Sequence, residues 1–175
     1  MSTIKFTHFP RTQPTPDYVF GIIDVFRSHE ETIATQDHAT GLKSDEVLAL
    51  LRNDLRKLGF DVESGKARQD RIVRPVFFGE NGEPTKTYSV DAYWKEHLCG
   101  LEVEAGRAVG GNAIYRDLIQ ALVMVDLDSL CLAVPNVYRY RNTESMNYDY
   151  TIKVANALFG HSRVAMPYCL TVTGY

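Results

Sequence analysis

The chain has 175 residues, of which 45% are hydrophobic and 23% are charged, and its formal net charge is −3. This composition is typical of a globular protein with a sizeable core and excludes a disordered chain. Because the net charge is slightly negative, contact with nucleic acid would have to use a local basic patch and not the charge of the whole surface. We expect a single domain over residues 1–175.

The cysteines and the N-terminal residues indicate the cellular compartment in which we expect the protein. Cys99, Cys131 and Cys169 lie far apart inside apolar segments, which is typical of reduced, buried thiols. The first residues lack the apolar core of a signal peptide, and no apolar run approaches the roughly 20 residues that cross a bilayer. The sequence therefore predicts a cytoplasmic protein with no membrane partner.

Residues 1–43 are expected to form an irregular arm followed by one helix. Residues 1–16 contain three of the seven prolines, which argues against regular structure there. From Asp17 to Phe26, apolar residues recur at helical spacing. The polar segment that follows includes His29 and His38, but such mixed charge without further ligands is typical of a solvated surface.

Residues 44–135 have the pattern of an α/β core. Ser44 is the expected cap of an amphipathic helix that ends at Gly59, and a short extended segment, FDVE, follows it. Three strands joined by hairpins, a helix and a nearly all-apolar strand come next. Their expected bounds are Pro75–Phe78, Ser89–Trp94 and Leu98–Ala105 for the three strands, Asn112–Val125 for the helix and Ser129–Pro135 for the last strand.

Residues 136–175 are expected to add a polar, tyrosine-rich connection, a helix that ends near Phe159 and a final strand. The order of elements predicts the α/β class, with a mixed sheet flanked by helices and an αβββαβ core. The residues expected in the core are Leu101, Val103, Leu118, Leu122, Leu130 and Leu132.

Three acids are candidate site residues. Because side chains alternate along a strand, Glu102 and Glu104 lie on the face opposite Val103, and pairing with the preceding strand brings Asp91 to the same face. Alternating glutamates alone usually mark a solvent face. Here a helix with a polar row of Asn112, Arg116 and Gln120 follows directly, and clustered carboxylates suit a hard cation such as Mg²⁺.

The order of these residues resembles that of the PD-(D/E)XK nuclease superfamily, which has the restriction-endonuclease-like fold. The shared pattern is an Asp on one strand, about ten further residues, Glu-x-Glu on the next strand, and then a helix. The matching positions are Asp91, Glu102 and Glu104, and Glu46 matches a glutamate that members often carry on the preceding helix. The sequence departs from the pattern in two places. Val90 replaces the usual proline, and Glu104 replaces the usual lysine, so the motif is ExE in place of ExK.

The resemblance implies a metal-dependent phosphodiesterase acting on nucleic acid, in the first place a DNA endonuclease. Asp91 and Glu102 would bind Mg²⁺ or Mn²⁺, and the metal would activate a water molecule. Glu104 would orient or deprotonate that water, and Gln120 or Arg116 would face the phosphate or support Glu102. Lys95, on the strand face of Asp91, would supply the missing positive charge.

Cations for nucleic-acid contact cluster in two segments. The first contains Lys66, Arg68, Arg71 and Arg74, and the second is the YRYR run with Arg139 and Arg141. Interleaved tyrosines in the second segment suit stacking on bases, although a solvated loop has the same composition. Two sites on a duplex would be provided most simply by a homodimer.

A catalytically inactive nuclease-like domain that serves binding or assembly is the alternative. The absence of a net positive charge and the absent lysine favour it. A glycosidase acid/base pair is a weaker alternative, because Glu102 and Glu104 are too close in sequence to flank a sugar from opposite sides.

Overall fold

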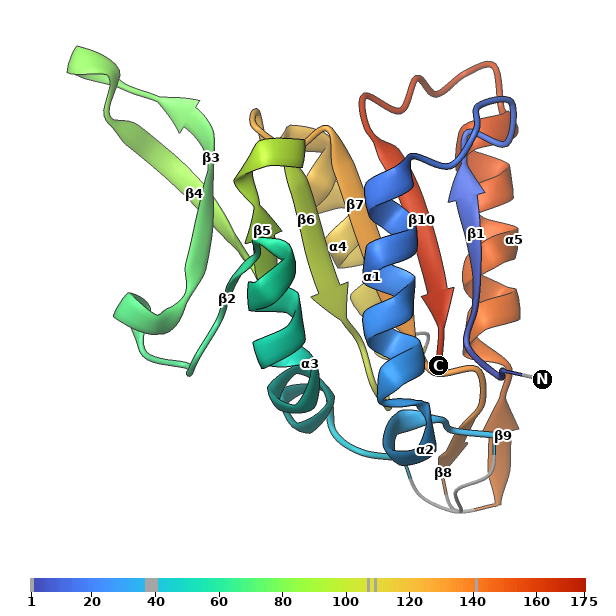
Figure 1. Cartoon of the computed structure of the whole chain (residues 1–175). Coiled ribbons are helices and arrows are strands. Elements are labelled where there is room, and N and C mark those ends of the chain that lie inside the picture. Colours follow the sequence, from blue (N-terminus) through green and yellow to red (C-terminus); the bar gives the residue numbers. More distant parts are fainter. Residues whose placement is uncertain (1, 37–40, 107, 109, 141) are drawn as a thin grey trace.

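A computed structural model describes residues 2–36, 41–106, 108, 110–140 and 142–175. Its centre is a six-stranded sheet in the order β1-β10-β7-β6-β5-β2 (Figure 1). Strands β6, β7 and β10 are mutually parallel, and the outer pairings β1–β10, β5–β6 and β2–β5 are antiparallel. The bounds are β1 Lys5–Phe9, β2 Asp61–Val62, β5 Ala92–Trp94, β6 Cys99–Val103, β7 Ser129–Val134 and β10 Cys169–Gly174.

Helices cover both faces of the sheet, so the apolar core has two layers. On one face lie α1 (Asp17–Ser28), α2 (Glu30–Ile33) and α3 (Ser44–Leu58), whose apolar residues pack on Leu101 and Val103. On the other lie α4 (Ala113–Val123) and α5 (Asn147–Gly160), which pack on Leu130 and Leu132. The predicted core residues are buried except Leu122, which is half-buried. No helix in the described part of the chain is long and apolar enough to span a bilayer.

Helix α3 forms largely as predicted, but it is capped differently. Its N-cap is Lys43, one residue before the predicted Ser44, and the Glu46 carboxylate accepts a hydrogen bond of 2.7 Å from the Lys43 backbone N–H. Gly59 ends the helix with φ at +117°, in the left-handed region that favours glycine. A Cβ atom at Gly59 would also lie 2.6 Å from the Trp94 indole nitrogen, so the close approach of β5 requires glycine too.

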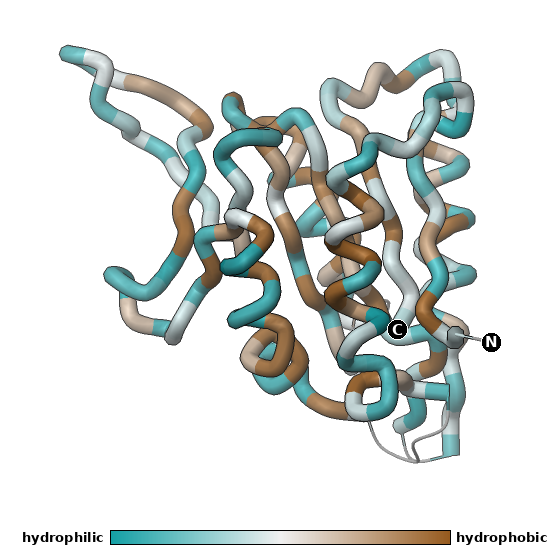
Figure 2. The backbone as a smooth tube through the Cα atoms, viewed as in Figure 1, coloured by the Kyte–Doolittle hydropathy of each residue, from teal (hydrophilic) through white to brown (hydrophobic). Residues whose placement is uncertain are grey.

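A two-stranded ribbon, β3 (Ile72–Phe78) with β4 (Pro84–Val90), protrudes beyond the β2 edge of the central sheet (Figure 1). The predicted strand Pro75–Phe78 belongs to this ribbon and not to the central sheet. The predicted strand Ser89–Trp94 divides at Asp91 into the end of β4 and the start of β5. Phe77 and Phe78, the last two residues of β3, are exposed. Figure 2 shows apolar stretches along the ribbon. The FDVE segment, containing β2, therefore supplies the first strand of the αβββαβ core.

Two segments predicted to be irregular contain strands. Residues 1–16 include β1, because backbone pairing with β10 stabilises a segment that has weak strand propensity of its own. The tyrosine-rich connection contains the hairpin of β8 (Tyr138–Tyr140) and β9 (Thr143–Ser145). Three short 3₁₀ turns complete the described elements, at Arg68–Asp70, Glu80–Gly82 and Lys95–His97.

Candidate active site

A polar cavity of about 340 Å³ lies where β4, β5 and β6 meet the polar side of α4. Acids and cations from four segments line it. The acids are Glu63, Asp91, Glu102 and Asp117, and the cations are Lys66, Arg71 and Arg116. The neutral side chain of Gln120 also lines the cavity.

Strand pairing explains how Asp91 and Glu102 reach the same cavity. Ala92 pairs with Leu101, so Asp91 continues alongside Glu102, on the face opposite Leu101. The Asp91 carboxylate accepts a hydrogen bond of 2.8 Å from the backbone N–H of Val103, at the end of β6. This contact fixes Asp91 at the break between β4 and β5. The two acids thus lie on the α4 face of the sheet, as strand parity predicts.

Burial raises the pKa of both carboxyl groups, which favours their protonated form when no cation is bound. Burial, with smaller contributions from the negative charges of Glu63 and Asp117, raises the pKa of Asp91 to about 7. Burial also raises the pKa of Glu102 well above its ordinary value, and the nearby charge of Asp91 adds to this. Glu102 is only 8% exposed. A cluster of buried acids whose pKa values are raised in spite of nearby cations is an environment that a bound dication would stabilise.

Arg116 joins Glu104 to Asp117. Its guanidinium nitrogen Nη2 lies 2.8 Å from Glu104 Oε1 and 2.9 Å from Asp117 Oδ1. Burial and the negative charge of Asp117 nevertheless raise the pKa of Glu104 to about 8. The second Asp117 oxygen, Oδ2, is buried and accepts no hydrogen bond within the described residues. Arg116 is therefore occupied in holding these two acids.

The carboxylate oxygens of Asp91 and Glu102 are the type of ligand that a hard divalent cation prefers. Mg²⁺ commonly binds one or two carboxylates and completes its shell with water, so Asp91 and Glu102 would suffice. Within the described part of the chain, no three Asp, Glu, His or Cys side chains are arranged to hold an ion together. An ion bound here would thus rely on two carboxylates and water.

Glu63 and Asp117 are cavity residues that sequence reasoning missed, whereas Glu46 lies elsewhere and Glu104 lies beside the cavity, where Arg116 binds it. Glu63 follows β2, and its backbone N–H donates to the Asp91 carbonyl oxygen at 2.8 Å. Asp117 was hidden because it lies beside the apolar row of α4. Glu46 is exposed and caps its own helix, and Glu104 lines a different cavity.

Of the predicted cations around Asp91, only Lys66 and Arg71 line the cavity besides Arg116. Arg68 is exposed in a 3₁₀ turn. Arg74 forms an ion pair with Asp126 and lies over the Tyr93 ring, 3.9 Å from its centroid. These contacts give it a structural role at the base of the ribbon.

The prediction that Lys95 shares the strand face of Asp91 is wrong. Strand β5 ends at Trp94, and Lys95 begins the 3₁₀ turn of the β5–β6 hairpin. Four residues of chain separate it from Asp91, about 13 Å at the rise of a strand. Lys95 is exposed there and lies at the opposite end of the hairpin from the acids.

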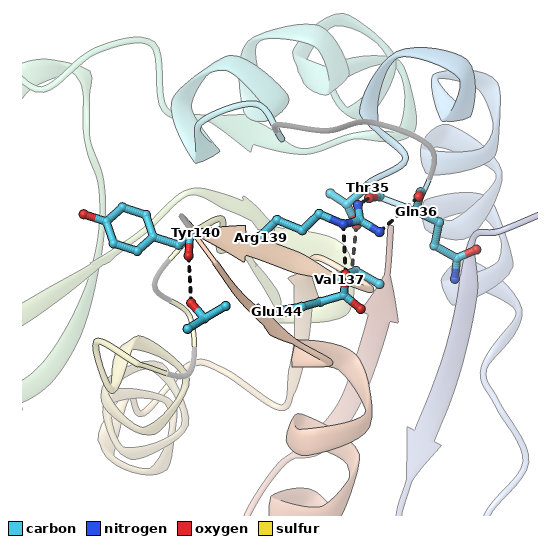
Figure 3. Close-up of polar contacts among 7 residues, drawn as sticks. Thr35, Gln36, Val137, Arg139, Tyr140 and Glu144 are labelled. Carbon is cyan, nitrogen blue, oxygen red and sulfur yellow. Dashed lines mark hydrogen bonds and ion pairs between the residues drawn. The ribbon is translucent and has the colours of Figure 1, made fainter.

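The predicted tyrosine-rich nucleic-acid segment lies at the other end of the sheet from the ribbon. Arg139 donates to the carbonyl oxygens of Thr35 and Gln36 at 2.9 and 3.4 Å and pairs with Glu144 at 3.0 Å (Figure 3). It therefore ties β8 to the segment after α2. Arg141 lies outside the described residues.

Comparisons with known proteins concern the fold. No family model matches the sequence, and no curated protein matches it. Among solved structures, the chain is similar to the restriction endonuclease BglII in its complex with a DNA 16-mer. The TM-score is 0.55 at 11% sequence identity, and the match covers 98% of this chain and 75% of that one. The chain therefore has a restriction-endonuclease-like fold.

Proposed function

We propose that this chain is a metal-dependent nuclease that hydrolyses a phosphodiester bond of nucleic acid, in the first place DNA. The observation that carries the proposal is the meeting of Asp91 and Glu102 in one cavity with Lys66 and Arg71, on a restriction-endonuclease-like fold. The structurally similar BglII was solved with DNA, which supports the choice of substrate class.

Asp91 and Glu102 would hold Mg²⁺ or Mn²⁺. When bound, such an ion lowers the pKa of a water molecule and stabilises the charge that develops on the phosphate. Lys66 and Arg71 are placed to contact phosphate oxygens at the cavity wall. They replace Lys95 as the source of the positive charge that the motif lacks.

Glu63 is the better candidate for the role that the sequence assigns to Glu104. Its carboxylate lines the cavity, and burial raises its pKa above the ordinary value, which suits a group that accepts a proton from water. Glu104 is held by Arg116, which also binds Asp117. Gln120 lines the cavity and could donate a hydrogen bond to a phosphate oxygen.

The test is cleavage of plasmid and of single-stranded oligonucleotides in Mg²⁺ and in Mn²⁺. We expect Glu102→Gln and Asp91→Asn to abolish cleavage, because each removes an anionic metal ligand while keeping the shape of the side chain. Glu96→Gln, an exposed acid in the β5–β6 turn, is the matched control and should cleave like the wild type. Equal activity in the wild type and Glu102→Gln would refute the proposed site.

The inactive binding domain remains the second candidate. The absence of a three-ligand cage among the described residues favours it. Titration calorimetry with Mg²⁺ and Mn²⁺ separates the two. Metal binding that is lost in Glu102→Gln supports the nuclease, whereas a wild-type protein that neither binds metal nor cleaves supports the binding domain.

A further inference from the structure

A second cavity, of about 370 Å³, lies beyond the carboxyl ends of β6 and β7. The segments that leave these parallel strands form its floor, with Glu104 to Gly106 following β6 and Pro135 to Arg139 following β7. The segment after α2 and the start of α3 close it, through Thr35, Lys43 and Ser44. In open α/β sheets the crevice beyond the carboxyl ends of the strands is a preferred place for ligands.

This cavity adjoins the carboxylate site. Glu104 lines it while its carboxylate is bound by Arg116, which lines the first cavity. Glu102 and Glu104 are two residues apart in extended chain, roughly 7 Å by the rise of a strand. A nucleic-acid strand whose phosphate lies at Asp91 and Glu102 would therefore have a neighbouring nucleotide at the mouth of the second cavity.

The lining suits a flat, polar-edged ring. Tyr138 contributes an aromatic surface, and its ring is nearly parallel to that of Tyr140, at an interplanar angle of 15° and a centroid distance of 6.4 Å. Lys43 and Ser44 bring hydrogen-bond donors, and Glu104 with the adjacent backbone brings acceptors. Nucleobases are recognised by this combination of stacking and edge hydrogen bonds.

The walls are held in place by contacts that do not need a ligand. Arg139 is bound to Thr35, Gln36 and Glu144, and its guanidinium is directed toward them in Figure 3. Gly106 lets the backbone pass close to Tyr138, because a Cβ atom there would lie 3.3 Å from the ring. The cavity is thus preformed and within the usual size range of small-ligand sites, which begins near 300 Å³.

We propose that the cavity lined by Lys43, Glu104 and Tyr138 binds one unpaired nucleobase of the substrate, next to the phosphate that is cut. This inference rests on the proposed nuclease function. A paired base is enclosed in the duplex stack and has to be extruded to enter such a pocket, and extrusion costs least where the base is already unpaired. The preferred substrate class is therefore single-stranded nucleic acid or a duplex with a mismatched position.

Fluorescence anisotropy in Ca²⁺ would compare the binding of three labelled nucleic acids. These are a single-stranded oligonucleotide, the duplex of that oligonucleotide with its complement, and the same duplex with one mismatched position. We expect the wild type to bind the unpaired substrates more tightly. Tyr138→Ala, which removes the stacking ring, and Ala105→Phe, which fills the cavity, should each lower that affinity about tenfold. Tyr138→Phe keeps the ring, and Ala157→Phe adds the same bulk on an exposed position of α5, so both should bind like the wild type.

Cleavage in Mg²⁺, measured on the same substrates, separates this inference from the proposed function. Loss of affinity in the two cavity variants without any cleavage by the wild type would support the base pocket and overturn the nuclease. If the wild type shows metal-dependent cleavage, either of two binding results would overturn the base pocket alone. One is duplex bound as tightly as single strands, and the other is wild-type affinity in both Tyr138→Ala and Ala105→Phe. No binding to any of the three nucleic acids would overturn both.

Discussion

Replacing Asp91 by asparagine should stabilise the metal-free protein at neutral and alkaline pH. In the fold, burial and neighbouring acids raise the pKa of Asp91 from its ordinary value of 3.8 to about 7. Folding therefore favours the protonated carboxyl, and ionised Asp91 destabilises the fold. Asparagine is uncharged at every pH, and its side-chain oxygen can still accept the 2.8 Å hydrogen bond from Val103.

The size and the pH window follow from proton linkage. Below the unfolded pKa both states are protonated and Asp91 carries no penalty, whereas the wild type loses stability as the pH rises through the interval from about 4 to 7. The full difference in unfolding free energy between Asp91→Asn and the wild type is about 4 kcal/mol, and at pH 5 this difference is about 2 kcal/mol. Asp91→Asn should therefore gain more stability over the wild type at pH 8 than at pH 5.

Urea denaturation in EDTA at pH 5 and pH 8 measures these differences. Asp61→Asn is the matched control, because Asp61 is exposed on β2 and its replacement should leave the unfolding free energy within about 0.5 kcal/mol. Saturating Mg²⁺ should reduce the advantage of Asp91→Asn, since an ion that binds the folded wild type stabilises it. An Asp91→Asn protein no more stable than the wild type at pH 8, or equally stabilised at both pH values, would refute the reasoning.

Three further predictions concern the core, the cavity wall and the helix cap. Leu132→Ala should cost about 2–5 kcal/mol of unfolding free energy in urea, because Leu132 is fully buried on β7 between β6 and β10; an unchanged midpoint would contradict this. Arg71→Ala should weaken nucleic-acid binding and reduce the slope of log affinity against log salt by about 1, as anisotropy at several salt concentrations would show. An unchanged slope would mean that Arg71 contacts no phosphate. Glu46→Ala should cost about 0.5–2 kcal/mol of stability through the lost cap while cleavage persists, and loss of cleavage in a folded variant would restore the catalytic role predicted from sequence.

The parts of the fold that depend on local pattern could be predicted from the sequence. Helix α3, the nearly all-apolar β7 and the alternation in β6 are each determined by spacing within one segment. The same alternation predicts that Asp91 and Glu102 share a face once their strands pair. What the sequence could not provide was pairing between distant segments. Strand β1 exists because β10, more than 150 residues later, pairs with it, and β2 has only two residues.

Glu63 illustrates why the rest of the candidate site was missed. It stands 28 positions before Asp91, in a short segment without a motif, and the ribbon β3–β4 occupies most of the interval. Only the pairing of β2 with β5 brings it to the cavity. Lys95, by contrast, is four positions from Asp91, but it lies in the 3₁₀ turn that follows β5, at the far end of the hairpin from Asp91. Lys95 is near Asp91 in the sequence but not in the fold, whereas Glu63 is far from Asp91 in the sequence and near it in the fold. The reason is that a sheet edge is assembled from segments that are not neighbours in the chain.

The charge balance of the cavity links these placements to function. Four acids line it, and two of the three cations beside them are already paired, Arg116 with Glu104 and Asp117, and Lys66 with Asp45. At a pH where the four acids are ionised, phosphate brought into the metal-free cavity would meet more negative than positive charge, so the acids would oppose binding. A dication at Asp91 and Glu102 reverses that sign at the place where the scissile phosphate has to lie. If the proposed function is right, metal is therefore needed to admit the substrate as well as to activate water, and nucleic-acid affinity should rise with divalent cation in the wild type but not in Glu102→Gln.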